Sequence, residues 1–286
     1  MKFITGSSHY RLSEKIAAKL FLSLDKPSVK YFKDHEISVQ IDASIAGEDV
    51  CILQSLSYPI NDHLIELLIL VNETKKKAKE VTVILPYFGY GRSFSSSALI
   101  ARLLETAGVD RIITIGLHSP EIETFFKIPI KNLGVTHLFG LDIKNRYKND
   151  LPVIVSPDKG GEKRARKLAD YLKTDCVFLH KERHMDGGVK IKRITGDAKE
   201  RCCIIVDDIV DSAETLTCTA KVLKEVGASS IEAYVIHAVL SEGSIEKLEQ
   251  SNVSSLTVTD TINQRLTEKI RVLGVSEILA KAIKPE

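Results

Sequence analysis

The sequence has 286 residues, is 44% hydrophobic and 27% charged, and carries a formal net charge of +2. This length allows two domains of ordinary size. The nearly neutral charge gives no reason to expect a nucleic acid or a membrane surface as a partner. No run of about 18 apolar residues is present, so no membrane span is expected.

The start of the chain and its cysteines indicate a compartment. Met1–Gly6 lacks the apolar core of a signal peptide and predicts a first strand that enters a turn. The five cysteines, an odd number without a Cys-x-x-Cys spacing, are typical of buried thiols in a reducing cytoplasm. A zinc site or a disulfide framework is not expected.

A pattern repeats with an offset of 119 residues, from Gly108 to Gly227. Each glycine follows a helical stretch, where a helix C-cap needs a positive φ, and precedes a β run that ends at His118 or His237. The repeat predicts two similar units, each with its own parallel sheet and right-handed crossovers.

The repeat also predicts the domain division. Val81–Leu85 and Cys202–Val206 are apolar strands, and each precedes a loop and a helix. Residues 1–141 would form one domain and residues 142–286 the other. The polar stretch Asp142–Pro152, rich in Lys, Asn and Asp, would link them.

The most informative stretch follows the second of these strands. Asp207 and Asp208 end the apolar run, and a short polar loop leads into a helical pattern. Ligands of parallel sheets gather at the carboxyl ends of strands, where a helix N-terminus can hold a phosphate. Carboxylates can take sugar hydroxyls or a hard cation. The stretch therefore suits a phosphorylated sugar, although an ordinary turn with solvated acids is the structural alternative.

Two further segments carry turns or charge. Pro157–Gly161 predicts a tight turn, in which glycines let backbone N–H groups approach an anion closely. Lys181 and Arg183 lie two residues apart, so on an extended strand both point to one side. A plain turn and a solvated basic loop are the alternatives.

Several motifs in order resemble one family. Cys202–Leu216 resembles the phosphoribosyl diphosphate (PRPP) motif of type I phosphoribosyltransferases. From Phe32 to near Ala282 the chain resembles the ribose-phosphate diphosphokinases. The matching motifs are Phe32-Lys33-Asp34-His35-Glu36, Pro86-Tyr87-Phe88-Gly89-Tyr90, Leu117-His118-Ser119-Pro120, Val155-Ser156-Pro157-Asp158-Lys159-Gly160-Gly161 and His180-Lys181-Glu182-Arg183.

The resemblance implies an α/β fold of two tandem type I phosphoribosyltransferase-like domains, each a mainly parallel sheet flanked by helices. It implies transfer of the β,γ-diphosphoryl group of ATP to the anomeric hydroxyl of ribose 5-phosphate, with Mg²⁺ as cofactor and AMP released. It also implies a cytoplasmic homo-oligomer built from dimers, with a hexamer as one arrangement.

The resemblance assigns the ribose 5-phosphate side to the second domain. Asp207 and Asp208 would contact the ribose hydroxyls. The 5-phosphate loop would comprise Asp211, Ser212, Ala213 and Thr215. The diphosphate loop would comprise Asp158, Gly160 and Gly161.

The resemblance also assigns the catalytic and ATP-binding residues. Lys181 and Arg183 would be catalytic, on an arm that closes over the triphosphate, and His118 with Asp158 would bind the metal. The residues for ATP would be Phe32, Asp34, Glu36 and Arg92, the first three reaching in from a neighbouring subunit. A β-hairpin is the structural alternative there, because alternation continues through Ile37–Ile41.

Three departures from the family pattern keep other functions open. Glu214 stands where the phosphate loop has Gly, and it should repel the phosphate unless it turns outward or pairs with a cation. Gly116 replaces an Asp two residues before His118, and Ser93 replaces a Gln. The alternative is a weak or inactive paralogue that binds or regulates an active synthetase. A phosphoribosyltransferase that uses PRPP is a third reading, which the doubled domain disfavours.

Overall fold

The computed structural model describes residues 1–286 except 42, 149, 184–188, 264–266 and 285–286; for residues 43, 181–183 and 189–192 it describes the backbone alone. The chain forms two compact units. The first holds Met1–Leu133, Asp260–Asn263 and Gly274–Glu286, and the second holds Gly134–Thr259 and Gln264–Leu273. None of the described helices is long and apolar enough to cross a membrane.

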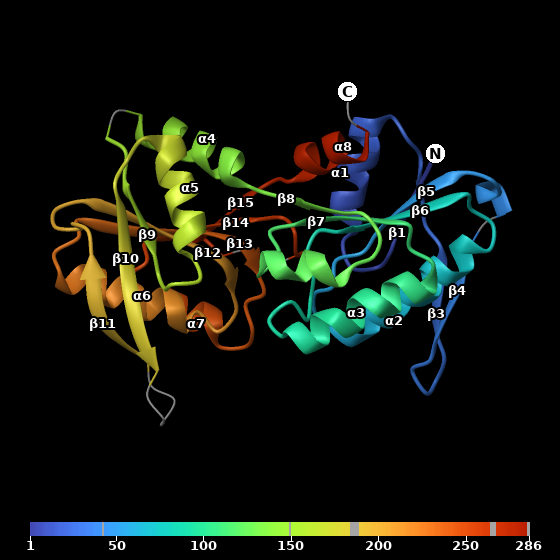
Figure 1. The fold of residues 1–286 in the computed structure, drawn as a ribbon, viewed down its shortest axis with the longest axis horizontal. Helices are drawn as coiled ribbons and strands as arrows, with labels where there is room; N and C mark the ends of the chain where they lie inside the picture. The colour runs from blue at the N-terminus through green and yellow to red at the C-terminus, as the bar shows by residue number, and fades with distance from the viewer. Residues whose placement is uncertain (42, 149, 184–188, 264–266, 285–286) are drawn as a thin grey trace. The chain divides into compact units, whose positions relative to one another are not determined.

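The first unit is a parallel sheet with helices on both faces (Figure 1). Its strand order is β2-β1-β5-β6-β7-β8, and every pair is parallel. The strands are β1 (Lys2–Thr5), β2 (Leu24–Asp25), β5 (Asp49–Leu53), β6 (Glu80–Leu85), β7 (Arg111–Ile115) and β8 (Ile130–Leu133). The helices are α1 (Tyr10–Leu20), α2 (Ile60–Lys75), α3 (Phe94–Ala107) and α8 (Ser276–Ile283), with short 3₁₀ turns at Ala43–Ile45 and Pro120–Phe125. A separate antiparallel hairpin pairs β3 (Ser28–Tyr31) with β4 (Ile37–Gln40).

The second unit has the same architecture with one added edge strand. Its order is β11-β10-β9-β12-β13-β14-β15, and among its pairs only β10 with β11 is antiparallel in the described chain. The strands are β9 (Val153–Ser156), β10 (Cys176–Arg183), β11 (Val189–Thr195), β12 (Cys202–Val210), β13 (Ser230–Ala238), β14 (Ser255–Thr259) and β15 (Ile270–Leu273). Helices α4 (Thr136–Tyr147) and α5 (Glu162–Leu172) cover one face, and α6 (Glu214–Glu225) and α7 (Ser244–Glu249) cover the other (Figure 1).

Burial on both faces explains the unbroken apolar strands. Cys203, Ile204 and Ile205 of β12 are completely buried, although successive side chains point to opposite faces. Leu216, Ala220 and Leu223 of α6 lie in the same hydrophobic cluster as Cys203 and Ile205. The predicted fold class, two mainly parallel sheets flanked by helices, is therefore confirmed.

The two predicted helix-capping glycines are also confirmed. Gly108 has a φ of 106° after α3, and Gly227 has a φ of 90° after α6. The N–H of Gly108 donates to the carbonyl of Glu105, and that of Gly227 donates to the carbonyl of Lys224. A side chain at this φ would be strained, so glycine ends both helices cheaply.

The strand correspondence drawn from the 119-residue offset is wrong by one strand. In chain order both sheets read 2-1-3-4-5-6 once β11 is set aside. The third strand is β5 in the first unit and β12 in the second, whereas the offset paired β6 with β12. Consecutive strand–helix–strand units look alike in sequence. The pattern therefore matched β12 to β6, which follows the true counterpart, β5, by one strand.

The predicted linker also needs correction. The sequence predicts a linker that begins at Asp142, but helix α4 extends from Thr136 to Tyr147 and so includes the first part of that stretch. The division between residues 141 and 142 therefore falls inside a helix. The assignment of residues 1–141 and 142–286 to two domains stays a prediction.

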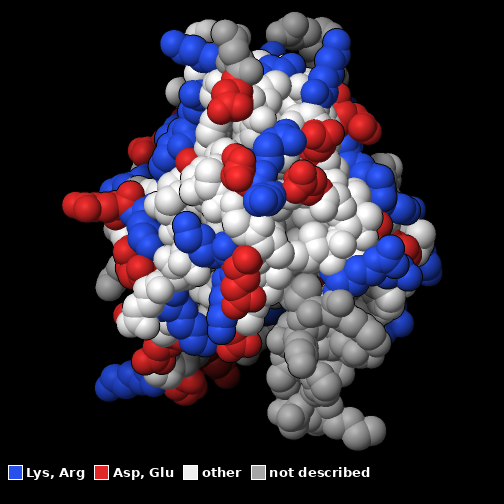
Figure 2. Space-filling view, turned by 90° about the vertical axis from the view of Figure 1, so that its left-hand side faces the viewer, with Lys and Arg blue, Asp and Glu red and all other residues white. Residues whose placement is uncertain are grey.

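Charged residues of both signs are scattered among uncharged ones on the surface drawn in Figure 2. Lys and Arg lie close to Asp and Glu over the described part of this face. This distribution agrees with the formal net charge of +2.

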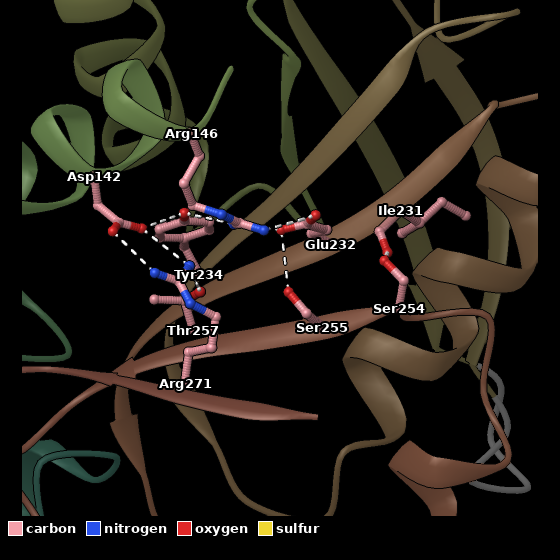
Figure 3. Close-up of polar contacts among 9 residues, drawn as sticks. All are labelled: Asp142, Arg146, Ile231, Glu232, Tyr234, Ser254, Ser255, Thr257 and Arg271. Carbon is pink, nitrogen blue, oxygen red and sulfur yellow. Dashed lines mark hydrogen bonds and ion pairs between the residues drawn. The ribbon is translucent and has the colours of Figure 1, made fainter. Parts of the chain in front are cut away.

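A polar network fastens α4 to the sheet of the second unit (Figure 3). Arg271 of β15 contacts both carboxylate oxygens of Asp142, at 3.0 and 3.2 Å, and the hydroxyl of Tyr234 donates to Asp142 at 2.6 Å. Arg146 donates to both carboxylate oxygens of Glu232, at 2.6 and 3.1 Å, and to the oxygen of Tyr234 at 3.0 Å. Burial would raise the pKa of Asp142, but the hydrogen bonds from Arg271 and Tyr234 outweigh it and lower that pKa.

The completely buried Tyr234 joins the two ion pairs of this network. Tyr234→Phe removes its hydroxyl and should lower the free energy of unfolding by about 1–3 kcal/mol, because charged partners lose a buried hydrogen bond. Denaturant unfolding measures the change. Tyr171→Phe is the matched control, since its hydroxyl meets His137 at 3.1 Å in an exposed contact. Equal effects of the two substitutions would contradict the role given to Tyr234.

Candidate functional site

Two neighbouring carboxylates lie near the carboxyl end of the third strand of the second sheet. β12 continues beyond Val206 to Val210, so Asp207 and Asp208 lie on the strand rather than after it. The side chains of both residues are buried. The backbone N–H of Asp208 donates to Oδ1 of Asp207 at 2.9 Å, which fixes the orientation of that carboxylate.

Arg164 of α5 bridges the two acids. Its Nη1 lies 3.2 Å from Oδ1 of Asp207, and its Nη2 lies 3.1 Å from Oδ1 of Asp208. The guanidinium group is planar and presents paired donors, so a single side chain can hold two carboxylates. Arg164 is not among the site residues predicted from the sequence.

The electrostatics of this cluster are dominated by burial. Burial and the charge of Asp208 raise the pKa of Asp207 from 3.8 to about 7; Arg164 opposes this increase and Asp158 adds to it. A positive charge or a set of hydrogen-bond donors brought by a ligand would favour the ionised form.

The turn after β9 brings a third carboxylate. The hydroxyl of Ser156 donates to the carbonyl of Asp158 at 2.8 Å, and the N–H of Gly161 donates to Oδ1 of Asp158 at 3.1 Å. A Cβ at Gly161 would lie 2.9 Å from Oγ of Ser156 and 3.6 Å from Nη1 of Arg164. Glycine is needed there because a side chain would press against the turn.

The loop between β12 and α6 is compact. Its described residues include Asp211, Ser212 and Thr215, all partly buried, and the buried Ala213. Ala213 has a φ of 62°, which is uncommon for a residue with a side chain. The backbone carbonyl of Asp211 accepts from Ser241 at 3.2 Å, and that of Ala213 accepts from Thr217 at 3.0 Å. The loop therefore delivers the N-terminus of α6 to the same edge of the sheet.

Glu214 does pair with a cation. Its carboxylate lies 3.1 Å from the ammonium group of Lys247 on α7, and its side chain is 65% exposed. From the sequence, Glu214 should repel a phosphate unless it turns outward or has such a partner. The ion pair with Lys247 therefore offsets most of the repulsion that Glu214 would exert on a phosphate.

The other predicted residues lie in the first unit or outside the described side chains. Phe32, Asp34 and Glu36 form the exposed turn of the β3–β4 hairpin, where the N–H of Phe32 donates to the carbonyl of Glu36 at 2.9 Å. The segment does form the β-hairpin that the alternating sequence pattern allowed as an alternative to a nucleotide-binding segment. Arg92 precedes α3 and His118 follows β7, both exposed. Their predicted roles toward ATP and metal stay predictions.

Lys181 and Arg183 lie at the end of β10, but their side chains are outside the described part of the structure. The prediction that both face one anion is therefore open. Among the described residues, no cluster of three or more His, Cys, Asp or Glu forms a metal site.

The first unit differs at the corresponding place. By position in the sheet, its counterpart of the loop after β12 follows β5 and begins with Gln54 and Ser55. Gln54 accepts from the N–H of Ser8 at 3.0 Å and donates to the carbonyl of His63 at 3.2 Å. Uncharged and internally bonded groups replace the acidic pair, so the acid site belongs to the second unit.

The sequence signal for Arg164 is weak. Arg164 lies in the first turn of α5, where the helix dipole disfavours a cation. The exposed Lys163 lies in the same turn, so the sequence does not single out Arg164.

The chain matches known proteins along nearly its whole length. Residues 1–108 match the family model described as the N-terminal domain of ribose phosphate pyrophosphokinase, and residues 189–285 match the phosphoribosyl synthetase-associated domain. The ribose-phosphate pyrophosphokinase of Hyphomonas neptunium is 42% identical over 298 residues, which cover 99% of this chain and 96% of the relative. That of Brucella melitensis is 38% identical with the same coverage.

A solved structure gives the same result. The phosphoribosylpyrophosphate synthetase from Mycobacterium smegmatis is similar with a TM-score of 0.93 and 31% identity, covering 99% of this chain and 97% of that one. The resemblance drawn from the motifs is confirmed by these comparisons.

The raised pKa of Asp207 gives a pH dependence of known sign. Folding favours the protonated form of Asp207. The contribution of this group to the free energy of unfolding is therefore complete below pH 3.8 and is lost as the pH rises through about 7. Asp207→Asn cannot ionise, so its melting temperature relative to the wild type should be higher at pH 8 than at pH 5. Thermal melts at the two pH values test this. Asp175→Asn, at a side chain that is 73% exposed, is the control; the same pH trend in both variants would rule out Asp207 as its source.

The ion pair of Glu214 predicts that its charge has little effect on ligand binding. Glu214→Gln should change the dissociation constant of ribose 5-phosphate by less than about two-fold, because exposed ion pairs couple weakly to their surroundings. Calorimetric titration measures this, with Glu225→Gln at the far end of α6 as the control. Markedly tighter binding by Glu214→Gln alone would show that Glu214 does repel the phosphate.

Proposed function

Because the chain belongs to the ribose-phosphate pyrophosphokinase family, we propose that it transfers the diphosphoryl group of ATP to ribose 5-phosphate, giving PRPP and AMP. The observation that carries this proposal is the acidic pair Asp207–Asp208, bridged by Arg164 at a strand end. Two loops, after β9 and after β12, flank this pair.

The acid pair suits the sugar. Asp207 and Asp208 can accept hydrogen bonds from the ribose hydroxyls, because ionised carboxylates offer only acceptors. The 5-phosphate would lie against the loop of Asp211, Ser212, Ala213 and Thr215. The N-terminus of α6 supplies backbone N–H groups there and a favourable dipole. The sugar and its phosphate would then be held by neighbouring parts of one unit.

The diphosphate needs donors and cations. Asp158, Gly160 and Gly161 lie on the turn after β9, where backbone N–H groups can approach closely. Lys181 and Arg183, on the neighbouring strand β10, would neutralise the transferred group. Phosphoryl transfer depends mainly on such positioning and charge stabilisation rather than on a protein nucleophile.

The hairpin residues suit a nucleotide base. Phe32 is 59% exposed at the hairpin turn, where its ring is available for stacking on adenine. Asp34 and Glu36 are exposed beside it and can accept an amino proton. Together with Arg92 they would bind ATP. The proposed assembly is a homo-oligomer built from dimers, with a hexamer as one arrangement, in which the hairpin would serve a neighbouring subunit.

Mg²⁺ is the proposed cofactor, and the residues present fit it. Mg²⁺ commonly uses one or two carboxylates and completes its shell with water and substrate phosphates, so it needs no cage of protein ligands. Asp158, fixed by the N–H of Gly161, offers carboxylate oxygens for this role. The assignment of His118 to the metal rests on the sequence resemblance alone. When bound, the ion neutralises phosphate charge.

Two further proposals concern the setting of the enzyme. All five cysteines are free thiols, which supports a reducing compartment, the cytoplasm. A weak or inactive paralogue remains the second candidate, because Gly116 provides no carboxylate near His118. The Lys247 ion pair removes Glu214 as a reason for it.

Turnover of the wild type and of Lys181→Ala tests the proposed function. With ATP, Mg²⁺, phosphate and ribose 5-phosphate, the wild type should form equal amounts of AMP and PRPP. Lys181→Ala should lower kcat by about 100-fold or more with a much smaller change in the KM for ribose 5-phosphate, because it acts on charge that develops in the transition state.

The control is Lys199→Ala, an exposed surface substitution that should leave both constants unchanged. A wild type that binds ribose 5-phosphate without forming PRPP would favour the paralogue. Equal losses in turnover and binding would remove Lys181 from the catalytic step.

A further inference from the structure

Arg164 is the one cation whose contacts with the acid pair the structure describes. Its side chain is 23% exposed, and those of Asp207 and Asp208 are 13% and 7% exposed. Screening by solvent is weak at such depths, so the charges of all three groups act strongly on one another.

The geometry of the contact is specific. Each terminal nitrogen of Arg164 meets a different carboxylate, and in each carboxylate the contacted atom is Oδ1. The same Oδ1 of Asp207 also accepts from the N–H of Asp208. These contacts fix the rotation of the Asp207 carboxylate, and Arg164 holds the two acids at a set separation.

The helical position of Arg164 is unfavourable for a cation. Arg164 occupies the first turn of α5, where its charge opposes the helix dipole. The acid pair compensates this local cost, which is a reason to look for a role beyond that of a surface charge.

We propose that Arg164 is a positioning residue for ribose 5-phosphate, which holds the carboxylates of Asp207 and Asp208 in the orientation that accepts hydrogen bonds from the sugar hydroxyls. This inference rests on the proposed function. Arg164 acts through the two carboxylates and does not itself contact the reacting atoms. Without it, two neighbouring buried acids repel each other, and one of them turns away or takes up a proton.

Steady-state kinetics of Arg164→Ala test the proposal. The KM for ribose 5-phosphate should rise about 10–100-fold, the range expected when hydrogen bonds to charged groups are lost. The KM for ATP should change by less than about two-fold, since uncoupled sites behave additively. Arg164→Lys should be intermediate, because an ammonium group keeps the charge but lacks the planar fork. Millimolar guanidinium chloride should restore part of the ribose 5-phosphate affinity of Arg164→Ala.

Arg166→Ala is the matched control on the same helix. Its side chain is 60% exposed, and its guanidinium lies over the ring of Phe178, 4.1 Å from the ring centre. Removing Arg166 should leave both KM values unchanged, and guanidinium should have no effect on that variant.

The outcomes separate the two proposals. A wild type that neither binds ribose 5-phosphate nor forms PRPP ends the proposed function, and the role of Arg164 ends with it. An active wild type with an unchanged ribose 5-phosphate KM in Arg164→Ala overturns the role of Arg164 alone. Equal rises in both KM values together with a lower melting temperature, unrelieved by guanidinium, would also overturn it, because Arg164 would then be merely structural.

Discussion

The site depends on keeping two adjacent carboxylates buried beside each other. Two unit negative charges about 5 Å apart repel by ~3 kcal/mol at an effective dielectric constant of 20. Arg164, which bridges the two acids, and the backbone N–H that binds Asp207 offset part of this repulsion. Burial and the remaining repulsion still raise the pKa of Asp207 to about 7. The acid pair and the arginine therefore form one electrostatic unit, and a change in any member should be felt by the other two.

Among the described residues, the side chains at one strand end, and not the sheet topology, distinguish the second unit from the first. Both sheets place their third strand at the same position, but β5 leads into Gln54 and Ser55, whose side chains bond internally. β12 carries Asp207 and Asp208 at the corresponding edge. The two sheets share one topology, and they differ at this strand end, which carries an acidic pair in the second unit and internally bonded, uncharged side chains in the first.

Sequence patterns predicted the fold class, the helix-capping Gly108 and Gly227, and the strand that carries Asp207. They failed where the answer depended on contacts distant in sequence. The 119-residue offset paired the wrong strands, because successive strand–helix–strand units share one pattern. Asp142 was assigned to a linker, since its polar neighbours hide the partners that hold it, 92 and 129 residues away. Arg164 was missed because its role is defined by β12, whereas the sequence near it shows only a basic helix.

Binding of ribose 5-phosphate to the Asp207→Asn, Asp208→Asn double variant tests the central claim most directly. Calorimetric titration of the wild type and of this variant, both without ATP, isolates the sugar site from the chemical step. The account predicts that the wild type binds and that the double variant, with a melting temperature near that of the wild type, binds at least about ten-fold more weakly, the loss expected for hydrogen bonds to charged acceptors. Equal affinity in the two proteins would contradict the claim that these carboxylates hold the sugar.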